Sequence, residues 1–328
     1  MKIAFAGKGG SGKTTLSALF TRYLATSGLP VVAIDADINQ NLGAALGAPA
    51  GELARLPPLG THVADIKELL RGDNPRIGSA AEMVKTTPPG PGSLLLAASG
   101  PNPLHERFGL RTPDGATLMV TGPFGADDLG VACYHSKVGA AELYLNHLVD
   151  APGEYVVVDM TAGADSFASG LFTRFDVTFL VAEPTVRGVG VYRQYADYAR
   201  DHGVTIRVIG NKVQDESDVA FLREHVGDAL AACFGHSAFV RAMEKGRHAP
   251  LEELEGDNAK TLAWMRDTVD STPQDWARFT RQTVEFHLRN ARAWAQSATG
   301  ADLEAQVDPF FVLGPEALAE QRRAAAAR

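Results

Sequence analysis

Cysteine, tryptophan and long apolar runs are all scarce in this chain of 328 residues. Its two cysteines, Cys133 and Cys233, lie far apart without C-x-x-C spacing, so we expect no disulfide framework and a reducing, cytosolic compartment. No uninterrupted apolar run approaches the roughly 18 residues that cross a bilayer, so no membrane span is predicted. The first apolar strand begins at the initial methionine, so we expect no signal peptide.

Positive charge is also in deficit. Lys and Arg number 31 against 39 Asp and Glu, which gives a formal net charge of −8. Because binding to nucleic-acid phosphates needs patches of Lys and Arg, this balance argues against nucleic acid as a partner. The remaining composition, 45% hydrophobic and 21% charged, is that of an ordinary globular protein.

Apolar runs alternate with helical patterns through the first 250 residues. The runs are apolar at successive positions, as expected for strands of a parallel sheet that is covered on both faces. The predicted strands are 3–6, 30–34, 94–98, 117–121, 155–158, 177–182 and 206–209, and the predicted helices are 13–27, 136–149, 188–202 and 215–226. Segments 86–92 and 101–114 are predicted loops. We therefore predict an α/β domain at 1–250, a doubly wound, mostly parallel sheet that binds ligand at the carboxyl ends of its strands.

Residues 251–328 differ in character and predict a C-terminal helical extension. No clear strand pattern occurs there, and all three tryptophans lie in it. Thr272-Pro273 resembles a helix start, with an N-cap followed by proline. Segment 315–328 predicts a short Ala-rich helix that lacks the basic, bulky apolar face of a membrane anchor. Four residues recur at helical spacing and are expected to pack on the protein's own core: Trp276, Phe279, Phe286 and Ala293.

A glycine-rich segment follows the first strand. Residues 7–15 read Gly-Lys-Gly-Gly-Ser-Gly-Lys-Thr-Thr, the P-loop pattern G-x-x-x-x-G-K-[ST] between a strand and a helix. Glycines let the backbone curl so that several N–H groups point at phosphate oxygens. Lys13 adds a positive charge at the β- and γ-phosphates, and the Thr14 hydroxyl can ligate Mg²⁺. The predicted site for ATP or ADP comprises Gly9, Gly10, Ser11, Gly12, Lys13, Thr14 and Thr15.

A second lysine, Lys8, falls where most P-loops carry no positive charge. Held near the phosphates, it can offset negative charge that builds up during phosphoryl transfer. The sequence K-G-G-x-G-K-T-T resembles the deviant Walker motif of the class that includes MinD, ParA, the ArsA arsenite ATPases, nitrogenase iron protein and CooC. In that class the extra lysine reaches the partner subunit's nucleotide, so the resemblance implies catalytic roles for Lys8 and Lys13 in a nucleotide-bridged homodimer. The alternative is a solvated loop lysine.

Two predicted strands end in aspartates. Asp35 and Asp37 follow one strand, and Asp159 follows the apolar run 156–158 in the Walker B form. Carboxylates at this edge can hold Mg²⁺ through water or orient an attacking water. The resemblance implies that Asp37 positions or activates that water and that Asp35 supports the metal site, while Asp159 completes the Mg²⁺ shell. Helix N-capping is the alternative for Asp35 or Asp37.

Further motifs complete the predicted nucleotide site. Thr161-Ala162-Gly163 gives, with Asp159, the D-x-x-G shape of a switch that senses the γ-phosphate through a flexible glycine. We call residues 159–164 the switch segment. Asn211-Lys212 ends another predicted strand, and an asparagine amide offers a donor and an acceptor that suit adenine. Asn211, Lys212 and Pro184 are the predicted base-side contacts.

Several segments are more specifically similar to CooC, a family of ATPases that help insert nickel into carbon monoxide dehydrogenase: 102–109, 133–147, 159–163, 181–185 and 210–213. That family carries Cys-x-Cys before a helix, and two subunits together supply four thiolates to a metal. This chain has Cys133-Tyr134-His135 at the corresponding place. Two copies of Cys133 and His135 would make a Cys₂His₂ site suited to Zn²⁺ or Ni²⁺. The alternative is that the metal site has been lost.

The sequence thus predicts a cytosolic, Mg-dependent ATPase that dimerises around ATP and acts on a client protein as a metallochaperone or maturation factor. Hydrolysis would change the positions of Asp37 and the switch segment. One alternative is a ParA- or MinD-like positioning or partition ATPase, which the acidic charge and the missing membrane anchor disfavour. Another is a regulatory switch in which the Trp-containing extension recruits a partner and metal has no part. The sequence does not identify the client.

Overall fold

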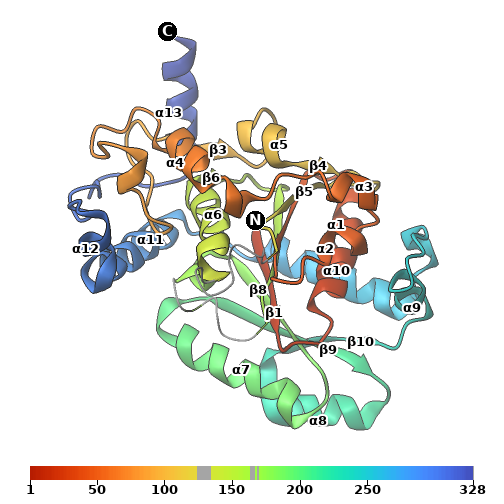
Figure 1. The fold of residues 1–328 in the computed structure, drawn as a ribbon. Helices are drawn as coiled ribbons and strands as arrows, with labels where there is room; N and C mark the ends of the chain where they lie inside the picture. The colour runs from red at the N-terminus through yellow and green to blue at the C-terminus, as the bar shows by residue number, and fades with distance from the viewer. Residues whose placement is uncertain (124–133, 163–166, 168–169, 328) are drawn as a thin grey trace.

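The first strand lies at the centre of a mostly parallel sheet, as the apolar runs predicted (Figure 1). The computed structural model describes residues 1–327 except 124–133, 163–166 and 168–169. Eight strands pair in the order β10-β9-β8-β1-β7-β2-β5-β4, and of these neighbours only β4 and β5 are antiparallel. Their bounds are β1 Lys2–Gly7, β2 Val31–Ala36, β4 Leu110–Arg111, β5 Thr117–Val120, β7 Tyr155–Met160, β8 Val177–Ala182, β9 Thr205–Val213 and β10 Leu230–Gly235.

Helices cover both faces of this sheet, so the central strands bury side chains on two sides. In β1, Ala4 packs in one hydrophobic cluster with α4 and α6, whereas Ile3 and Phe5 pack in another with α1 and α10. This alternation is the two-residue period of a strand. The helices named here are α1 Lys13–Thr26, α4 Val63–Arg71, α6 Tyr134–His147 and α10 Gly256–Ser271. The predicted doubly wound α/β fold is confirmed.

The other helices are shorter or lie towards the edges. Their bounds are α2 Leu42–Ala45, α3 Ala50–Leu53, α5 Pro103–Phe108, α7 Val186–Ala199, α8 Glu216–Val226, α9 Ala238–Met243, α11 Trp276–Asn290, α12 Gln296–Thr299 and α13 Pro315–Ala326. Helix α13 projects from the body of the molecule (Figure 1). Among the helices of the described ranges, none combines the length and apolar character that a membrane crossing needs.

The C-terminal helices are present as predicted, but their details differ from the prediction. Thr272 ends α10, and α11 begins after Asp275, whose carboxylate accepts a hydrogen bond from the Arg278 amide at 2.8 Å. The helix start predicted at Thr272-Pro273 was therefore wrong. An aspartate side chain caps the first turn of α11 instead.

Part of the predicted apolar stripe faces the core. Phe279 and Phe286 are buried, but Ala293 is exposed. The reason is a π-helical turn at Ala291–Ala295, which widens the helix and shifts the phase of its side chains. Ala291 and Ala295 face inward in its place.

Three other differences arise where local signals were weak. The predicted loop 101–114 holds α5, which Asn102 caps by accepting from the Leu104 amide at 3.0 Å, and the strand β4. In the predicted strand 94–98, only Leu96–Ala97 (β3) pairs, and it pairs with β6 (Leu148–Val149) outside the main sheet. Strand β10 was missed because it is a half-exposed edge strand whose sequence, Leu-Ala-Ala-Cys-Phe-Gly, has no continuous bulky apolar run.

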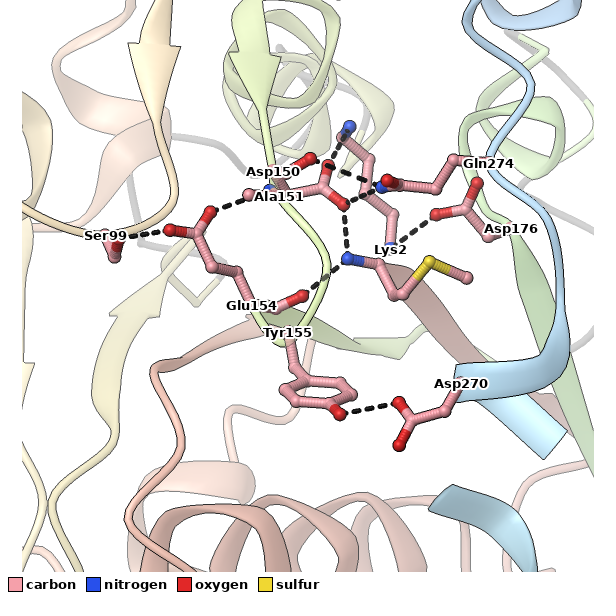
Figure 2. Close-up of polar contacts among 10 residues, drawn as sticks. Lys2, Ser99, Asp150, Ala151, Glu154, Tyr155, Asp176, Asp270 and Gln274 are labelled. Atoms are coloured by element: carbon pink, nitrogen blue, oxygen red, sulfur yellow. Dashed lines mark hydrogen bonds and ion pairs between the residues drawn. The ribbon is translucent and has the colours of Figure 1, made fainter. Parts of the chain in front are cut away.

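A buried ion pair joins the first strand to the C-terminal extension (Figure 2). The Lys2 ammonium lies 2.5 Å from Asp150 Oδ1, and both side chains are almost completely buried. The amide nitrogen of Gln274, in the turn before α11, donates to Asp150 Oδ2 at 2.5 Å. The Lys2 ammonium also lies 4.4 Å from the centroid of a Trp276 ring, which is within cation–π range. These contacts fix the start of α11 against the edge of the sheet opposite the P-loop.

Removing the Asp150 charge should destabilise the protein, because the buried Lys2 ammonium would lose its partner. We expect Asp150→Asn to lower the free energy of unfolding by about 3–5 kcal/mol in denaturant titrations. Burial alone would raise the pKa of Asp150, but the charges of Lys2 and of the Met1 amino group outweigh it and lower that pKa. The wild type should therefore keep this stabilisation above the unfolded aspartate pKa of about 3.9 and lose it as the pH falls through the lower folded value.

The variant should show a flatter acid limb in the same titrations. Asp257→Asn, which removes a fully exposed partner of Lys260 on α10, is the matched control and should leave stability unchanged. Equal stability of the two variants would contradict this account of Asp150.

Candidate nucleotide-binding site

The P-loop connects β1 to α1 and takes a conformation that requires glycine. Gly10 and Gly12 have φ of 83° and 96°, in the left-handed region that other residues avoid. A Cβ atom at Gly12 would lie 2.2 Å from Asn211 Nδ2. That amide donates instead to the Ser11 carbonyl at 2.7 Å. The loop is therefore held by the end of β9, which lies 200 residues later in the chain but only two strands away from β1 in the sheet.

Lys212 adds a second contact from β9 to the loop. It is one of two non-glycine residues with positive φ in the described chain, at 60°. Its ammonium donates to the Gly10 carbonyl at 2.8 Å and lies 2.5 Å from Glu183 Oε1. Asn211 and Lys212 thus both contact the P-loop backbone. The contact of Asn211 with adenine stays a prediction, and its amide donor is already engaged.

The strand register places two carboxylates side by side beneath the loop. Asp35 in β2 and Asp159 in β7 are direct partners in the parallel ladder. Asp35 accepts hydrogen bonds from the amides of Leu42, at 2.8 Å, and Asp37, at 3.2 Å. Asp159 Oδ2 accepts from the Thr14 hydroxyl at 2.6 Å. The P-loop helix and both acidic strands therefore meet at one point.

Burial of these acids opposes their ionisation. Desolvation, together with the charges of Asp159 and Asp37, raises the pKa of Asp35 to about 8. Desolvation also raises the pKa of Asp159 to about 7, against the hydrogen bond from Thr14 and the charge of Lys13. Crowded, desolvated carboxylates favour a cation among them.

The donor set fits Mg²⁺. Asp159 Oδ1 is buried and makes no hydrogen bond within the described ranges, while the Thr14 hydroxyl lies beside it. Carboxylate and hydroxyl oxygens are the ligands that hard cations prefer, and Mg²⁺ commonly takes one or two carboxylates together with substrate phosphates and water. In keeping with such a partial shell, no three His, Cys, Asp or Glu side chains of the described residues form a complete metal cage.

Two adjoining cavities open above these residues. The first, of about 290 Å³, is lined by P-loop residues and by Asp37 and Asn39. The second, of about 450 Å³, lies over the ends of β9 and β10. Four residues line both: Gly12, Thr15, Lys212 and Glu244. The first has the basic, amide-rich wall that suits phosphates, and the second is placed for the rest of a nucleotide.

Most of the predicted site residues meet at this edge. Those that line the first cavity are Gly9, Gly10, Gly12, Lys13, Thr14, Thr15, Asp37 and Lys212, and Asn211 lines the second. Asp35 and Asp159 lie buried behind them. Lys8, Ser11 and Pro184 line neither cavity.

The predicted Zn²⁺ or Ni²⁺ site cannot be placed in the same way. Cys133 lies outside the described residues, and His135 falls in the first turn of α6, where no side chain is described. The second cysteine, Cys233, is a free, half-buried thiol in β10, and burial raises its pKa.

Sequence reasoning missed several cavity residues. Asn39 donates to Asp37 Oδ1 at 2.9 Å from both its backbone and its side-chain nitrogen, and its position two residues after Asp37 could have indicated this turn. Glu183 lines neither cavity but pairs with the cavity residue Lys212, and it could have been found as the neighbour of Pro184. Glu244 gave no signal, because it follows the strand β10 that was not predicted.

Comparison with known proteins agrees with this geometry. The family described as CobQ/CobB/MinD/ParA nucleotide binding domain matches residues 2–231. The carbon monoxide dehydrogenase accessory protein CooC of Rhodospirillum rubrum is 31% identical over 249 residues, which cover 75% of this chain and 88% of CooC. An uncharacterised ATP-binding protein of Methanocaldococcus jannaschii is 29% identical over 231 residues, 70% of this chain and 81% of that protein.

Solved structures show the same fold. MinD of Aquifex aeolicus in the MinC:MinD cell division complex superimposes with a TM-score of 0.55 at 18% identity, covering 84% of this chain and 98% of MinD. MinD of Pyrococcus horikoshii in complex with Mg-ADP gives a TM-score of 0.54 at 17% identity, covering 82% and 96%.

The resemblance predicted from the P-loop and the CooC-like segments is thereby confirmed. The family match covers the P-loop, the strands that carry Asp35, Asp159 and Asn211, and the loops after them, whereas the cavity residues at 234–244 lie beyond it. This chain belongs to the CobQ/CobB/MinD/ParA nucleotide-binding family and is a P-loop ATPase.

Proposed function

We propose that this protein is a Mg-dependent ATPase that forms a nucleotide-bridged homodimer and serves as a CooC-like metallochaperone or metalloenzyme maturation factor. The observation that carries the catalytic part is the meeting of Lys13, Asp37 and the Thr14–Asp159 pair at one cavity. The similarity to CooC over 75% of the chain supports the maturation role. We assign the ATPase unit to residues 1–250 and the helical extension to 251–328.

Each side chain of the cavity has a chemical task in this proposal. The P-loop amides and Lys13 bind the phosphates, and Asp37, whose carboxylate Asn39 orients, holds the attacking water. Thr14 and Asp159 would hold Mg²⁺, with Asp35 in support, and the bound ion would neutralise charge on the phosphates. Lys8 would act on the nucleotide of a second subunit.

A positioning or partition role is the main rival. The similar MinD structures support the shared fold, and at under 20% identity they carry no functional argument. The net charge of −8 disfavours retention on DNA. A regulatory switch without metal is the other alternative. A pull-down with an ATP-trapped Asp37→Ala variant would identify the client and separate these roles.

Lys13 and Asp37 should affect different steps. Lys13→Ala should weaken ATP binding roughly 10- to 100-fold in calorimetry, because a charge-assisted phosphate contact is worth about 1.5–3 kcal/mol. Asp37→Ala should keep its ATP affinity and lower phosphate release about 100-fold or more, since its task lies in the hydrolytic step. Lys260→Ala, an exposed lysine on α10, is the control. Wild-type affinity in Lys13→Ala, or wild-type turnover in Asp37→Ala, would remove that residue from its role.

Lys8 should matter only between subunits. We expect Lys8→Ala to bind ATP normally as a monomer, but to lose ATP-induced dimerisation and most hydrolysis, because its charge would no longer reach the partner's nucleotide. Light scattering with and without ATP measures the dimer. If variant and wild type dimerise equally with ATP, the trans-acting lysine is excluded.

The metal prediction rests on the sequence of Cys133 and His135. Purified dimer should bind about one Zn²⁺ or Ni²⁺ per two chains, because each chain supplies half of a four-ligand set. Affinity should fall at low pH, since both ligands must lose their protons. Cys133→Ser should abolish binding, and Cys233→Ser should not. Elemental analysis that finds no stoichiometric metal in loaded wild-type dimer would remove the metallochaperone role and leave the ATPase intact.

A further inference from the structure

Helix α11 of the extension packs on the chain just beyond the switch segment. Gly170, with φ of 85°, sits under the ring of Phe286, and a Cβ at Gly170 would come within 2.3 Å of that ring. The Phe286 ring also meets Phe172 edge-on, with centroids 5.7 Å apart. Phe286 is 8% exposed, so this contact is a sealed part of the core.

The contact continues into the segment that follows Asp159. Phe167 lies 4.4 Å from Phe172 and 4.5 Å from Tyr195 of α7, measured between ring centroids. His202, after α7, lies 5.3 Å from both Phe172 and Phe286. A continuous set of rings therefore connects Phe167, eight residues after the Walker B aspartate, with α11.

The rest of α11 is anchored on both sides of this contact. Gln282 and Arg278 donate to the carbonyls of His202 and Gly203, in the turn between α7 and β9. On the other side the short helix at Leu171–Arg174 ends in the fully buried Arg174. Helix α11 is thus held by contacts other than that of the Phe286 ring with Gly170.

Arg174 extends the connection to a third element. Its Nε donates to Asn146 Oδ1 of α6 at 2.6 Å, and its guanidinium lies 5.8 Å from the Phe279 ring of α11. Helix α6 begins at Tyr134 and therefore directly follows Cys133. Residues 170–174 consequently pack between α11 and α6.

We propose that Phe286 is a positioning residue for ATP hydrolysis. Its ring fixes the position of Gly170, eleven residues after Asp159, so that α11 sets how often Asp159 reaches the geometry for turnover. Packed protein interiors adopt discrete arrangements rather than deforming smoothly. A helix that packs against a mobile segment therefore favours some positions of that segment over others. The extension acts on the rate of the ATPase without contributing a group to the nucleotide cavity. This inference rests on the ATPase activity alone and holds with or without the metal role.

Steady-state kinetics of the full-length protein test the proposal. Phe286→Ala should lower kcat about tenfold or more, because displacing a catalytic segment by even about 1 Å can cost 100-fold, while KM for ATP rises by a smaller factor, about three- to fivefold. Phe286→Leu, which keeps most of the apolar volume, should restore most of kcat. Trp294→Ala is the matched control, an aromatic residue of the same extension that is 49% exposed, and should behave as wild type. Folded Phe286→Ala with the turnover of Trp294→Ala would overturn the proposal.

Hydrogen exchange gives a second readout that needs no variant. If α11 biases the switch, nucleotide at the switch must bias α11 in return. Amides of 276–290 should exchange more slowly with Mg²⁺ and a non-hydrolysable ATP analogue than without nucleotide, while those of 315–326 should not change. Unchanged exchange in 276–290 would contradict the coupling even if Phe286→Ala failed to fold. If the wild type binds ATP, Lys13→Ala weakens that binding as expected and Phe286→Ala turns over normally, this inference is rejected and the proposed function stands.

Discussion

The pairing of β1 between β7 and β8 is the constraint on which the site depends. The side chains in the middle of β1 are fully buried on both faces of the sheet. Their burial fixes the register in which β1 pairs with β7 and β8. That register determines where, along the direction of the strands, β1 ends and the P-loop begins. It also puts Phe5 of β1 opposite Asp159 of β7, which in turn faces Asp35 of β2. A slip of β1 by one residue would move the start of the loop by roughly 3.3 Å relative to these carboxylates and reverse the faces on which the β1 side chains lie.

At the same edge of the sheet, burial opposes the ionisation of two carboxylates, and a bound cation would favour it. Burial raises the pKa of Asp35 to about 8 and that of Asp159 to about 7, so both acids resist ionisation where they lie. A divalent cation with its nucleotide phosphates reverses that balance, because each charge then gains an opposite partner in a poorly solvated place. The hydrogen bond from Thr14 to Asp159 joins the helix that carries Lys13 to this balance. We therefore expect nucleotide binding to affect the end of β7 through the charge of Asp159.

The C-terminal extension is built into the ATPase body rather than attached to its surface. Helix α10 shares a hydrophobic cluster with α1 and β1, and the turn before α11 contributes Gln274 to the ion pair of Lys2 and Asp150 (Figure 2). Breaking such contacts exposes both apolar area and an unpaired buried charge, so the extension and the sheet are expected to unfold together. Its contact with Gly170 and Phe172 follows from this anchoring.

Local patterns were strong enough to predict the phosphate half of the site. The spacing of glycines and Lys13, the aspartates after two apolar strands and the runs of the central strands are short-range signals, because backbone conformation and two-sided burial act directly on those residues. The sequence alone thereby determined the class of fold, the P-loop and its acidic partners. It did not reveal β10 or the phase shift at Ala291–Ala295, since an edge strand and a π-helical turn owe their form to neighbours distant in the chain. Glu244 and the contact of Phe286 with Gly170 were decided only by tertiary packing, which joins segments through burial and shape that no local pattern records.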